Sequence, residues 1–318
     1  MPIDPFLAEK LPLLDGLTDF AAAFEDPSQR ARLDEFMSSA PGYDAPPIDT
    51  VDTEVQGRHG LIRIRIYRRP ASGTTSHPGL LWMHGGGFVF GDLDMPEADS
   101  VSRELAHRAD AVVISVDYHL AIDGVHFPVP HDDVMDVWRW AQANAVELGI
   151  DPERISIGGA SAGGNLAAGA GLHIRDDGDL PQPAGLLLAY PVLHGVVPPA
   201  SEELEAKIVE VPPVLRFPPD VRAGLNSNYL GGPVTDAPAY AMPANGDLAG
   251  LPPVRVLTCE YDDLRASGEP FADQLRAAGV PTHARVELGM FHGHLNYQPS
   301  LGAVDDSLEF LAEGLRRH

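Results

Sequence analysis

Short apolar runs alternate with longer segments of helical periodicity through most of the chain. Residues 53–60 and 61–69 alternate polar and apolar side chains with a period of two, which predicts a hairpin. Six later apolar runs predict strands at residues 79–85, 111–118, 154–160, 184–192, 253–261 and 283–290. Segments of helical spacing predict helices at residues 96–109, 131–149, 161–176, 268–278 and 300–317. This alternation predicts an α/β fold in which helices flank a mostly parallel, eight-stranded sheet.

Two segments depart from the alternation, residues 1–48 and residues 195–245. The second contains nine prolines, which interrupt weak helical patterns. A structureless loop of this length inside a compact domain is typically a functional lid or disordered. We interpret the two segments as a mainly helical cap, formed by an N-terminal segment and a proline-rich insertion. The catalytic core is then residues 49–194 and 246–318. A disordered terminus and a long surface loop are the alternative.

The sequence GGASAGGNLAA, Gly158 to Ala168, lies between a predicted strand and a predicted helix. It contains the pattern G-x-S-x-G with Ser161 at its centre, in the strand–turn–helix context that a nucleophile elbow requires. Small neighbours allow the chain to turn sharply, and the first turn of the next helix directs free N–H groups toward the hydroxyl. Taken alone, the same glycines also fit a structural bend.

A second glycine-rich sequence, HGGGF at residues 84–88, follows the third predicted strand. Acyl transfer places negative charge on a carbonyl oxygen, and backbone N–H groups aimed at that oxygen stabilise it. We predict that Gly85, Gly86 and Ala162 provide these N–H groups. A flexible hairpin or a phosphate-binding loop is the alternative, although neither glycine-rich sequence matches a known nucleotide-binding pattern.

A serine nucleophile needs a histidine to accept its proton and a carboxylate to orient that histidine. In folds with this elbow, the acid and then the histidine follow the serine along the chain. Asp262 follows the seventh predicted strand and His292 follows the eighth, so we predict a triad of Ser161, Asp262 and His292. The alternatives close by are two acids and one histidine: Glu260, Asp263 and His294.

These motifs resemble the hormone-sensitive-lipase-like branch of the α/β-hydrolases, microbial carboxylesterases with an HGGG oxyanion loop. The resemblance covers residues 50–318 and includes DYHLA at residues 117–121 and DPERISIGG at residues 151–159. In that family the first aspartate of a stretch like Asp-Pro-Leu-Arg is the triad acid, which matches Asp262, and the histidine precedes a glycine, which matches His292. The resemblance implies the α/β-hydrolase fold and short to medium acyl chains, with the cap shaping the pocket.

The chain departs from the family pattern at three places. Ala160 precedes the serine where the family most often has an aspartate, so any polar network that the aspartate supports is missing or rebuilt. His294 stands where the family usually has phenylalanine. After the fourth strand, the family's Arg, Pro and Glu are replaced by His119, Ile122 and Asp123.

Several apolar residues near these motifs are candidates for the walls of a substrate pocket. They are Phe88, Val89 and Phe90 beyond the oxyanion loop, and Phe20, Phe24, Phe36 and Phe217 in the cap segments. Core packing explains the spacing of these residues equally well.

Composition and charge narrow the kind of partner. The 318 residues are 44% hydrophobic and 21% charged, as is typical of a globular protein. A formal net charge of −24 disfavours nucleic acid and anionic membranes. No apolar run approaches the roughly 20 residues that span a bilayer, and no signal peptide is visible. We therefore expect a cytoplasmic protein without membrane insertion, and a homodimer is compatible with the chain.

The remaining reactive residue types have simpler explanations. Cys259 is the only cysteine, which excludes an intrachain disulfide, and at a strand end it fits core packing better than a reactive thiol. His283, His292 and His294 could suggest a metal site, but no further ligand has diagnostic spacing. We expect neither a metal nor another cofactor.

Together the motifs predict a serine carboxylesterase that hydrolyses small-molecule esters through an acyl-enzyme intermediate. A lactonase, an amidase, an acyltransferase or a dehydratase on the same residues is an alternative. A non-catalytic ligand-binding receptor is an alternative of another class, which the presence of all three triad residues disfavours.

Overall fold

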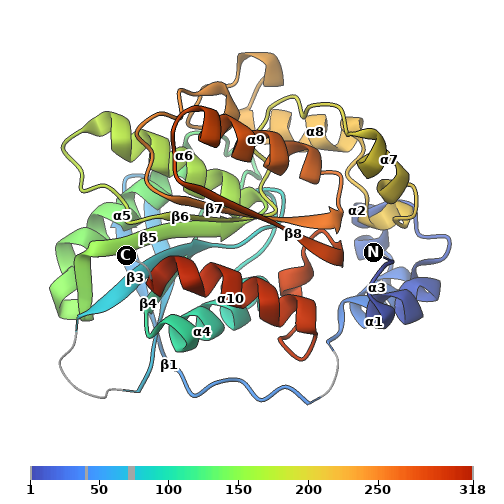
Figure 1. Cartoon of the computed structure of the whole chain (residues 1–318), viewed down its shortest axis with the longest axis horizontal. Helices are drawn as coiled ribbons and strands as arrows, with labels where there is room; N and C mark the ends of the chain where they lie inside the picture. Colours follow the sequence, from blue (N-terminus) through green and yellow to red (C-terminus); the bar gives the residue numbers. More distant parts are fainter. Residues whose placement is uncertain (1, 40–41, 71–75, 317–318) are drawn as a thin grey trace.

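Eight strands form a single sheet in the computed structural model, which describes residues 2–39, 42–70 and 76–316 (Figure 1). The strands are β1 (Asp49–Gly57), β2 (Gly60–Arg68), β3 (His77–Met83), β4 (Val112–Asp117), β5 (Ile150–Ala160), β6 (Leu186–Ala189), β7 (Val254–Tyr261) and β8 (Thr282–Phe291). Their order in the sheet is β1-β2-β4-β3-β5-β6-β7-β8. β2 pairs antiparallel with β1 and with β4, and the other pairs are parallel. The predicted mostly parallel sheet is confirmed.

Helices cover both faces of the sheet. They are α4 (Pro96–Ala109), α5 (Val129–Leu148), α6 (Ala162–Asp177), α9 (Arg265–Ala277) and α10 (Gly302–Arg316). α4 and α10 pack together on one face, and α5, α6 and α9 cover the other (Figure 1). All five correspond to predicted helices, and Arg317, the predicted end of the last one, lies outside the described residues.

The hydrophobic core consists of two clusters, one on each face of the sheet. Successive side chains of a strand point to opposite faces. In β3, Leu81 and Met83 therefore join the cluster under α5, α6 and α9, while Leu80 and Trp82 join the cluster under α4 and α10. The central strands are apolar on both faces, which is why they appear in the sequence as continuous apolar runs.

Both segments interpreted as a cap contain short helices. The N-terminal segment holds α1 (Pro5–Lys10), η1 (Leu11–Leu14), α2 (Phe20–Glu25) and α3 (Pro27–Met37). The proline-rich segment holds α7 (Glu202–Ile208), η2 (Pro213–Leu215), α8 (Pro219–Leu230), η3 (Val234–Asp236) and η4 (Pro243–Asn245). Proline occupies the first turn of α1, α3 and α8, where no backbone N–H is needed. α2 contacts η2, so the two segments meet although they are far apart in sequence.

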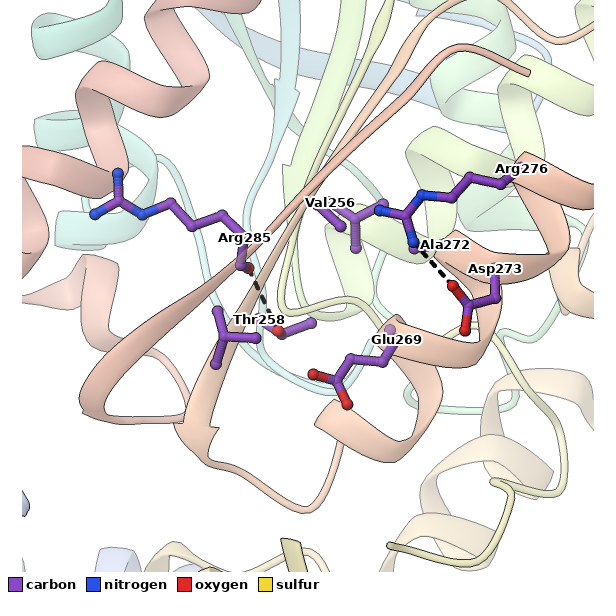
Figure 2. Close-up of a pocket in the computed structure, with 10 residues that line it drawn as sticks. Val256, Thr258, Glu269, Ala272, Asp273, Arg276 and Arg285 are labelled. Atoms are coloured by element: carbon purple, nitrogen blue, oxygen red, sulfur yellow. Dashed lines mark hydrogen bonds and ion pairs between the residues drawn. The ribbon is translucent and has the colours of Figure 1, made fainter. Parts of the chain in front are cut away.

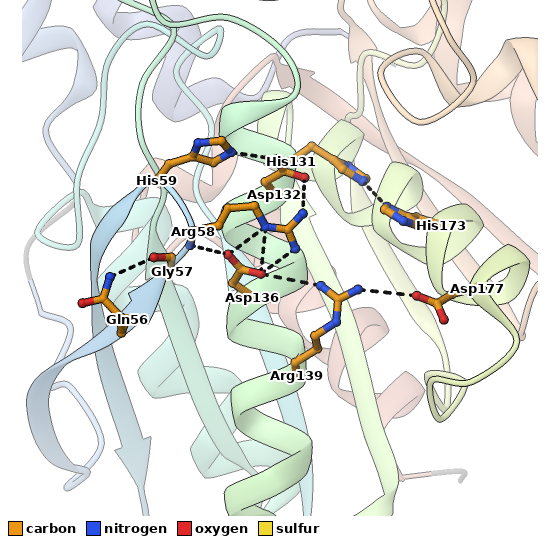
Figure 3. A network of polar contacts seen from close by, with 10 residues as sticks. All are labelled: Gln56, Gly57, Arg58, His59, His131, Asp132, Asp136, Arg139, His173 and Asp177. Carbon is orange, nitrogen blue, oxygen red and sulfur yellow. Dashed lines mark hydrogen bonds and ion pairs between the residues drawn. The ribbon is translucent and has the colours of Figure 1, made fainter.

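A polar network fixes the edge hairpin to α5 (Figure 3). Arg58, in the turn between β1 and β2, pairs with Asp132 at 3.1 Å and with Asp136 at 2.6 Å. In the same network, His131 Nε2 of α5 lies 2.9 Å from His173 Nδ1 of α6. These contacts join the hairpin, α5 and α6. Within the residues that the structure describes, no helix has the length and apolar character needed to cross a membrane.

Candidate active site

Four segments that carry the predicted site residues meet at one edge of the sheet. β3, β5, β7 and β8 run in the same direction, so the segments that follow them lie at their common carboxyl edge. These segments carry the HGGGF sequence, Ser161, Asp262 and His292. The parallel topology therefore gathers residues that are spread over more than half of the chain.

Ser161 occupies a strained turn between β5 and α6. Its φ of 53° and ψ of −113° lie outside the regions that residues other than glycine favour. A Cβ atom added to Gly163 would lie 2.2 Å from the carbonyl oxygen of Met83, and one added to Gly159 would lie 2.4 Å from the Gly163 carbonyl. The turn therefore packs directly against the end of β3, and both glycines of G-x-S-x-G are required by space.

His292 connects the serine to the aspartate. His292 Nε2 lies 2.9 Å from Ser161 Oγ, and His292 Nδ1 lies 2.8 Å from Asp262 Oδ2. The other Asp262 oxygen accepts the backbone N–H of Leu264 at 2.8 Å. Ser161 is 8% exposed and Asp262 is 2% exposed, so water screens these contacts weakly. The structure thus brings the three predicted residues together in the geometry of a serine–histidine–aspartate triad.

The electrostatic environment of His292 favours its protonated form. Burial lowers the pKa of His292, because it disfavours the charged imidazolium. The charge and hydrogen bond of Asp262 raise this pKa, and so do the charges of Glu97 and Asp263. Their sum holds the pKa of His292 above its ordinary value. A histidine of raised pKa is a stronger base toward the serine hydroxyl, and the same carboxylates stabilise the cation that forms.

The HGGGF loop differs in one respect from the predicted oxyanion site. The N–H of Gly85, one of the predicted donors, is already engaged, because it donates to Glu97 Oε2 at 2.6 Å. Among the described residues, the N–H groups of Gly86, Gly87 and Ala162 have no acceptor. Gly86 and Gly87 have φ angles of 111° and 60°, which glycine adopts readily. The N–H groups of this loop that have no acceptor among the described residues therefore include those of Gly86 and Gly87, whereas that of Gly85 is engaged.

The two alternative acids bind cationic side chains of the proline-rich segment. Asp263 forms a bidentate ion pair with Arg216, at 2.7 and 3.0 Å, and accepts the backbone N–H of Phe217 at 2.9 Å. Glu260 pairs with Lys207 at 3.0 Å. Both carboxylates therefore hold the proline-rich segment against the core beside Asp262.

The alternative base, His294, is buried in a separate hydrogen-bonded chain. Its Nδ1 lies 3.2 Å from Cys259 Sγ, its Nε2 lies 2.8 Å from Ser307 Oγ, and Ser307 Oγ donates to Glu287 at 3.0 Å. Burial and the nearby His292 lower the pKa of His294 to about 3. Burial raises the pKa of the Cys259 thiol well above its ordinary value, which agrees with a packing role rather than a reactive one.

The pocket candidates nearest the triad differ in their surroundings. The ring of Phe217 packs edge-on against His292, with centroids 4.8 Å apart, and therefore borders the site. Phe88 is 1% exposed and stacks on Tyr229 of α8 at 3.9 Å, so core packing accounts for it. Val89 is half-buried in the same loop.

The other aromatic candidates lie on the N-terminal segment and at the end of the loop. Phe20 stacks on both Phe24 and Phe90, each at 6.1 Å, and the three rings remain about 40% exposed. Phe36 is buried against Phe291. The exposed rings link the N-terminal segment to the oxyanion loop, whereas Phe36 belongs to the core.

Two departures from the family pattern have structural explanations. Ala160 is buried and packs in the apolar cluster that contains Trp82 and Tyr190. His119 donates its backbone N–H to the buried Asp133 at 2.7 Å, and its ring Nδ1 lies at the same distance from this carboxylate. The segment after β4 is therefore tied to α5.

Glu97 is absent from the residues predicted from the sequence. An acidic residue in the first turn of a helix is common, because the positive end of the helix dipole stabilises its negative charge. The sequence therefore contains no signal that separates a buried Glu97 from an ordinary solvated one.

A hollow of about 280 Å³ lies between α9 and the strands β7 and β8, and none of the triad residues lines it (Figure 2). Charged residues from both elements line it, including Glu269, Asp273, Arg276 and Arg285. Asp273 and Arg276 pair with one another at 2.8 Å. In the described part of the chain, no three His, Cys, Asp or Glu side chains are grouped to bind a metal ion.

Comparison with known proteins identifies the family. A family model for the α/β-hydrolase fold matches residues 80–296. The carboxylesterase NlhH of Mycobacterium tuberculosis is 36% identical over 301 residues, which cover 93% of this chain and 89% of that protein. The esterase LipI of the same species is 34% identical over 276 residues, 85% of this chain and 81% of LipI. A hyperthermophilic esterase from the archaeon Pyrobaculum calidifontis superposes with a TM-score of 0.84 and 31% identity, over 99% of this chain and 98% of that one. The chain therefore belongs to the α/β-hydrolase fold family, in its hormone-sensitive-lipase-like branch.

Proposed function

We propose that this serine carboxylesterase hydrolyses short- to medium-chain acyl esters with Ser161 as the nucleophile, His292 as the general base and acid, and Asp262 as the orienting group. The observation that carries the proposal is the continuous chain of contacts from Ser161 through His292 to Asp262, at 2.9 and 2.8 Å. The names of the relatives NlhH and LipI, a carboxylesterase and an esterase, support ester hydrolysis.

Each half of the reaction uses the same groups. Ser161 Oγ attacks the ester carbonyl carbon while its proton moves to His292 Nε2. The N–H groups of Gly86, Gly87 and Ala162 bind the resulting oxyanion. The bond to the alcohol then breaks, and His292 returns the proton to the departing oxygen. Water attacks the acyl-enzyme with His292 again as base, which releases the carboxylic acid and restores Ser161.

The acyl-chain preference rests on the family resemblance and on the residues around His292. Phe217 provides an apolar surface in contact with the catalytic imidazole. Arg216 and Phe217 are held in place by Asp263, next to the triad aspartate. We propose that the proline-rich segment and the N-terminal segment together act as the cap and limit the length of the acyl group.

The test is a turnover screen with p-nitrophenyl acetate, butyrate, octanoate and palmitate, combined with labelling by a fluorophosphonate. Ser161→Ala is expected to lower kcat by at least about 10³-fold and to abolish labelling. The matched control is Ser102→Ala, which removes a buried hydroxyl of α4. This variant is expected to keep the wild-type kcat and to be labelled by the fluorophosphonate. Full turnover and labelling in Ser161→Ala would contradict the nucleophile assignment, and a preference for palmitate would contradict the proposed chain length.

A further inference from the structure

Glu97 is a buried carboxylate whose hydrogen-bond partners among the described residues lie in the HGGGF loop or close to His292. It lies in the first turn of α4 and is 2% exposed. Its Oε2 accepts the N–H of Gly85 at 2.6 Å, and its Oε1 accepts the hydroxyl of Tyr190 at 2.5 Å. The Asn296 amide lies 3.4 Å from Oε1. A buried carboxylate is costly unless it is hydrogen-bonded, so these partners fix its position.

The contact with Gly85 sets the start of the oxyanion loop. A Cβ atom on Gly85 would lie 2.5 Å from Glu97 Oε2, so the carboxylate approaches the backbone as closely as a glycine allows. A hydrogen bond to a charged acceptor is stronger than one to a neutral acceptor. The bond directs the Gly85 N–H toward α4 and leaves the next two N–H groups of the loop, those of Gly86 and Gly87, without a protein acceptor among the described residues.

The contacts with Tyr190 and Asn296 reach the catalytic histidine. The Tyr190 ring packs edge-on against His292, with centroids 4.9 Å apart. Asn296 donates to the carbonyl of Gly293 at 3.1 Å, in the turn that follows His292. The charge of Glu97 also contributes to the raised pKa of His292, although burial of the imidazole opposes it. One carboxylate therefore contacts both the oxyanion loop and the surroundings of the general base.

We propose that Glu97 is a positioning residue of this esterase, which orients the oxyanion loop through Gly85 and supplies a second negative charge near His292. The inference rests on the proposed roles of Ser161 and His292. Both oxygens of the Glu97 carboxylate are bound to protein groups and the side chain is buried, so in this proposal Glu97 acts through those groups. Its effect reaches the transition state through the N–H groups that bind the oxyanion and through the stability of the imidazolium.

The primary test is Glu97→Gln, which keeps the size of the side chain but removes its charge and one acceptor oxygen. We expect kcat to fall about 10- to 100-fold with KM changed less than about threefold, since loss of one oxyanion donor costs about 10²- to 10³-fold and this change only misorients the loop. The affinity for a trifluoromethyl ketone transition-state analogue should fall by a similar factor. The acid limb of the pH–kcat profile should move to lower pH, a shift that a merely structural role would not produce.

The matched control is Glu104→Gln on the same helix. Glu104 is also buried, and its carboxylate binds Arg108 at 2.8 Å and the hydroxyl of Tyr43, outside the site. We expect this variant to keep the wild-type kcat and acid limb, even where its melting temperature falls. Tyr190→Phe keeps the ring against His292 and the charge of Glu97, so kcat should fall about two- to tenfold without movement of the acid limb.

A folded Glu97→Gln enzyme with wild-type kcat, analogue affinity and acid limb would overturn the inference. If Glu97→Gln does not fold, Tyr190→Phe provides the test of the inference. Wild-type kcat in Tyr190→Phe would show that the hydrogen bond from Tyr190 to Glu97 does not affect His292, and would overturn the inference. Active Ser161→Ala would instead refute the proposed function. Inactive Ser161→Ala together with wild-type behaviour of Glu97→Gln would refute only the role of Glu97.

Discussion

The two nitrogens of the His292 ring have different partners, and this difference supports the roles that we propose for them. Nδ1 faces the fully buried carboxylate of Asp262, while Nε2 faces the hydroxyl of Ser161. The carboxylate holds the proton on Nδ1, so Nε2 presents its lone pair to the serine. In the proposed mechanism His292 accepts the serine proton only when its imidazole is neutral, and the pKa of His292 lies above the ordinary value of 6.5.

Activity should therefore decline on the acid side with a midpoint above pH 6.5. As the pH falls through the pKa of His292, the imidazole becomes protonated and kcat/KM decreases in proportion. Asp262→Asn should lower kcat/KM by about 10³- to 10⁴-fold. It should also move the midpoint to lower pH, because the carboxylate charge of Asp262 is the main contribution that raises the pKa of His292 against the effect of burial. The measurement is a pH–rate profile with p-nitrophenyl butyrate.

The neighbouring aspartate provides the comparison. Asp263→Asn removes the ion pair with Arg216 but leaves the triad hydrogen bonds intact, so its loss of kcat/KM should be smaller. A greater loss in Asp263→Asn than in Asp262→Asn would show that the triad acid is assigned to the wrong residue.

At the scale of elements, the site depends on how tightly the β5–α6 turn packs against β3. Gly163 lies in the first turn of α6, at the point where that helix touches the carbonyl groups of Met83 and His84. Any side chain there must displace one of the two elements. Ser161 precedes Gly163 in one of these elements, and the HGGGF loop follows Met83 in the other, so their relative position depends on this contact.

Gly163→Ala should therefore destabilise the protein by about 2 to 4 kcal/mol and lower kcat by at least about 10²-fold, because the added methyl group overpacks a backbone contact. Urea denaturation and ester turnover measure the two effects.

Gly224→Ala in α8 is the matched control. A Cβ atom at Gly224 would meet no atom within 4 Å, so replacing this helical glycine should raise stability by about 0.5 to 1 kcal/mol. A Gly163→Ala enzyme with wild-type stability and kcat would contradict the packing argument.

Element boundaries show where sequence patterns are sufficient. The helix predicted at residues 96–109 is observed over the same residues, since its apolar face is continuous and Pro96 marks its start. The helix predicted from Gly268 begins earlier, at Arg265, and contains Pro270. Glycine and proline weaken the helical pattern there, and Asp262, which accepts the N–H of Leu264, helps to begin the turn. That contact involves a triad side chain and has no counterpart in the periodicity.

For the whole molecule, buried histidines link stability to pH. Burial lowers the pKa of His131 and His294 to about 3 and that of His194 to about 4. These side chains lie in different parts of the core, and each is hydrogen-bonded in its neutral form, as the His131–His173 pair illustrates (Figure 3). The unfolded chain binds protons at these histidines near pH 6.5, whereas the folded chain does not.

The free energy of unfolding should accordingly fall as the pH decreases from 7 to 5. Each of the three histidines contributes a loss of about 1 to 2 kcal/mol over this window, because the unfolded state gains protons there that the folded state excludes. His292, with a raised pKa, acts in the opposite direction. Urea denaturation at pH 7, 6 and 5 measures the dependence.

His131→Gln retains a polar group near His173 and should make stability less dependent on pH. The control, His107→Gln, changes an exposed residue of α4 and should leave the dependence as it is in the wild type. Stability that is constant or rises from pH 7 to pH 5 in the wild type would contradict the prediction.

The sequence by itself determined the fold class, the succession of strands and helices, and the order of serine, aspartate and histidine along the chain. These depend on local patterns: strand and helix periodicity, and a glycine-flanked serine at a strand–helix junction. Only the tertiary structure decided which partner each polar group has. It placed Glu97 against Gly85, Asp263 against Arg216 and Phe217 against His292. Such contacts join residues from separate elements, and a hydrogen bond or a packed ring depends on distances that no local pattern encodes.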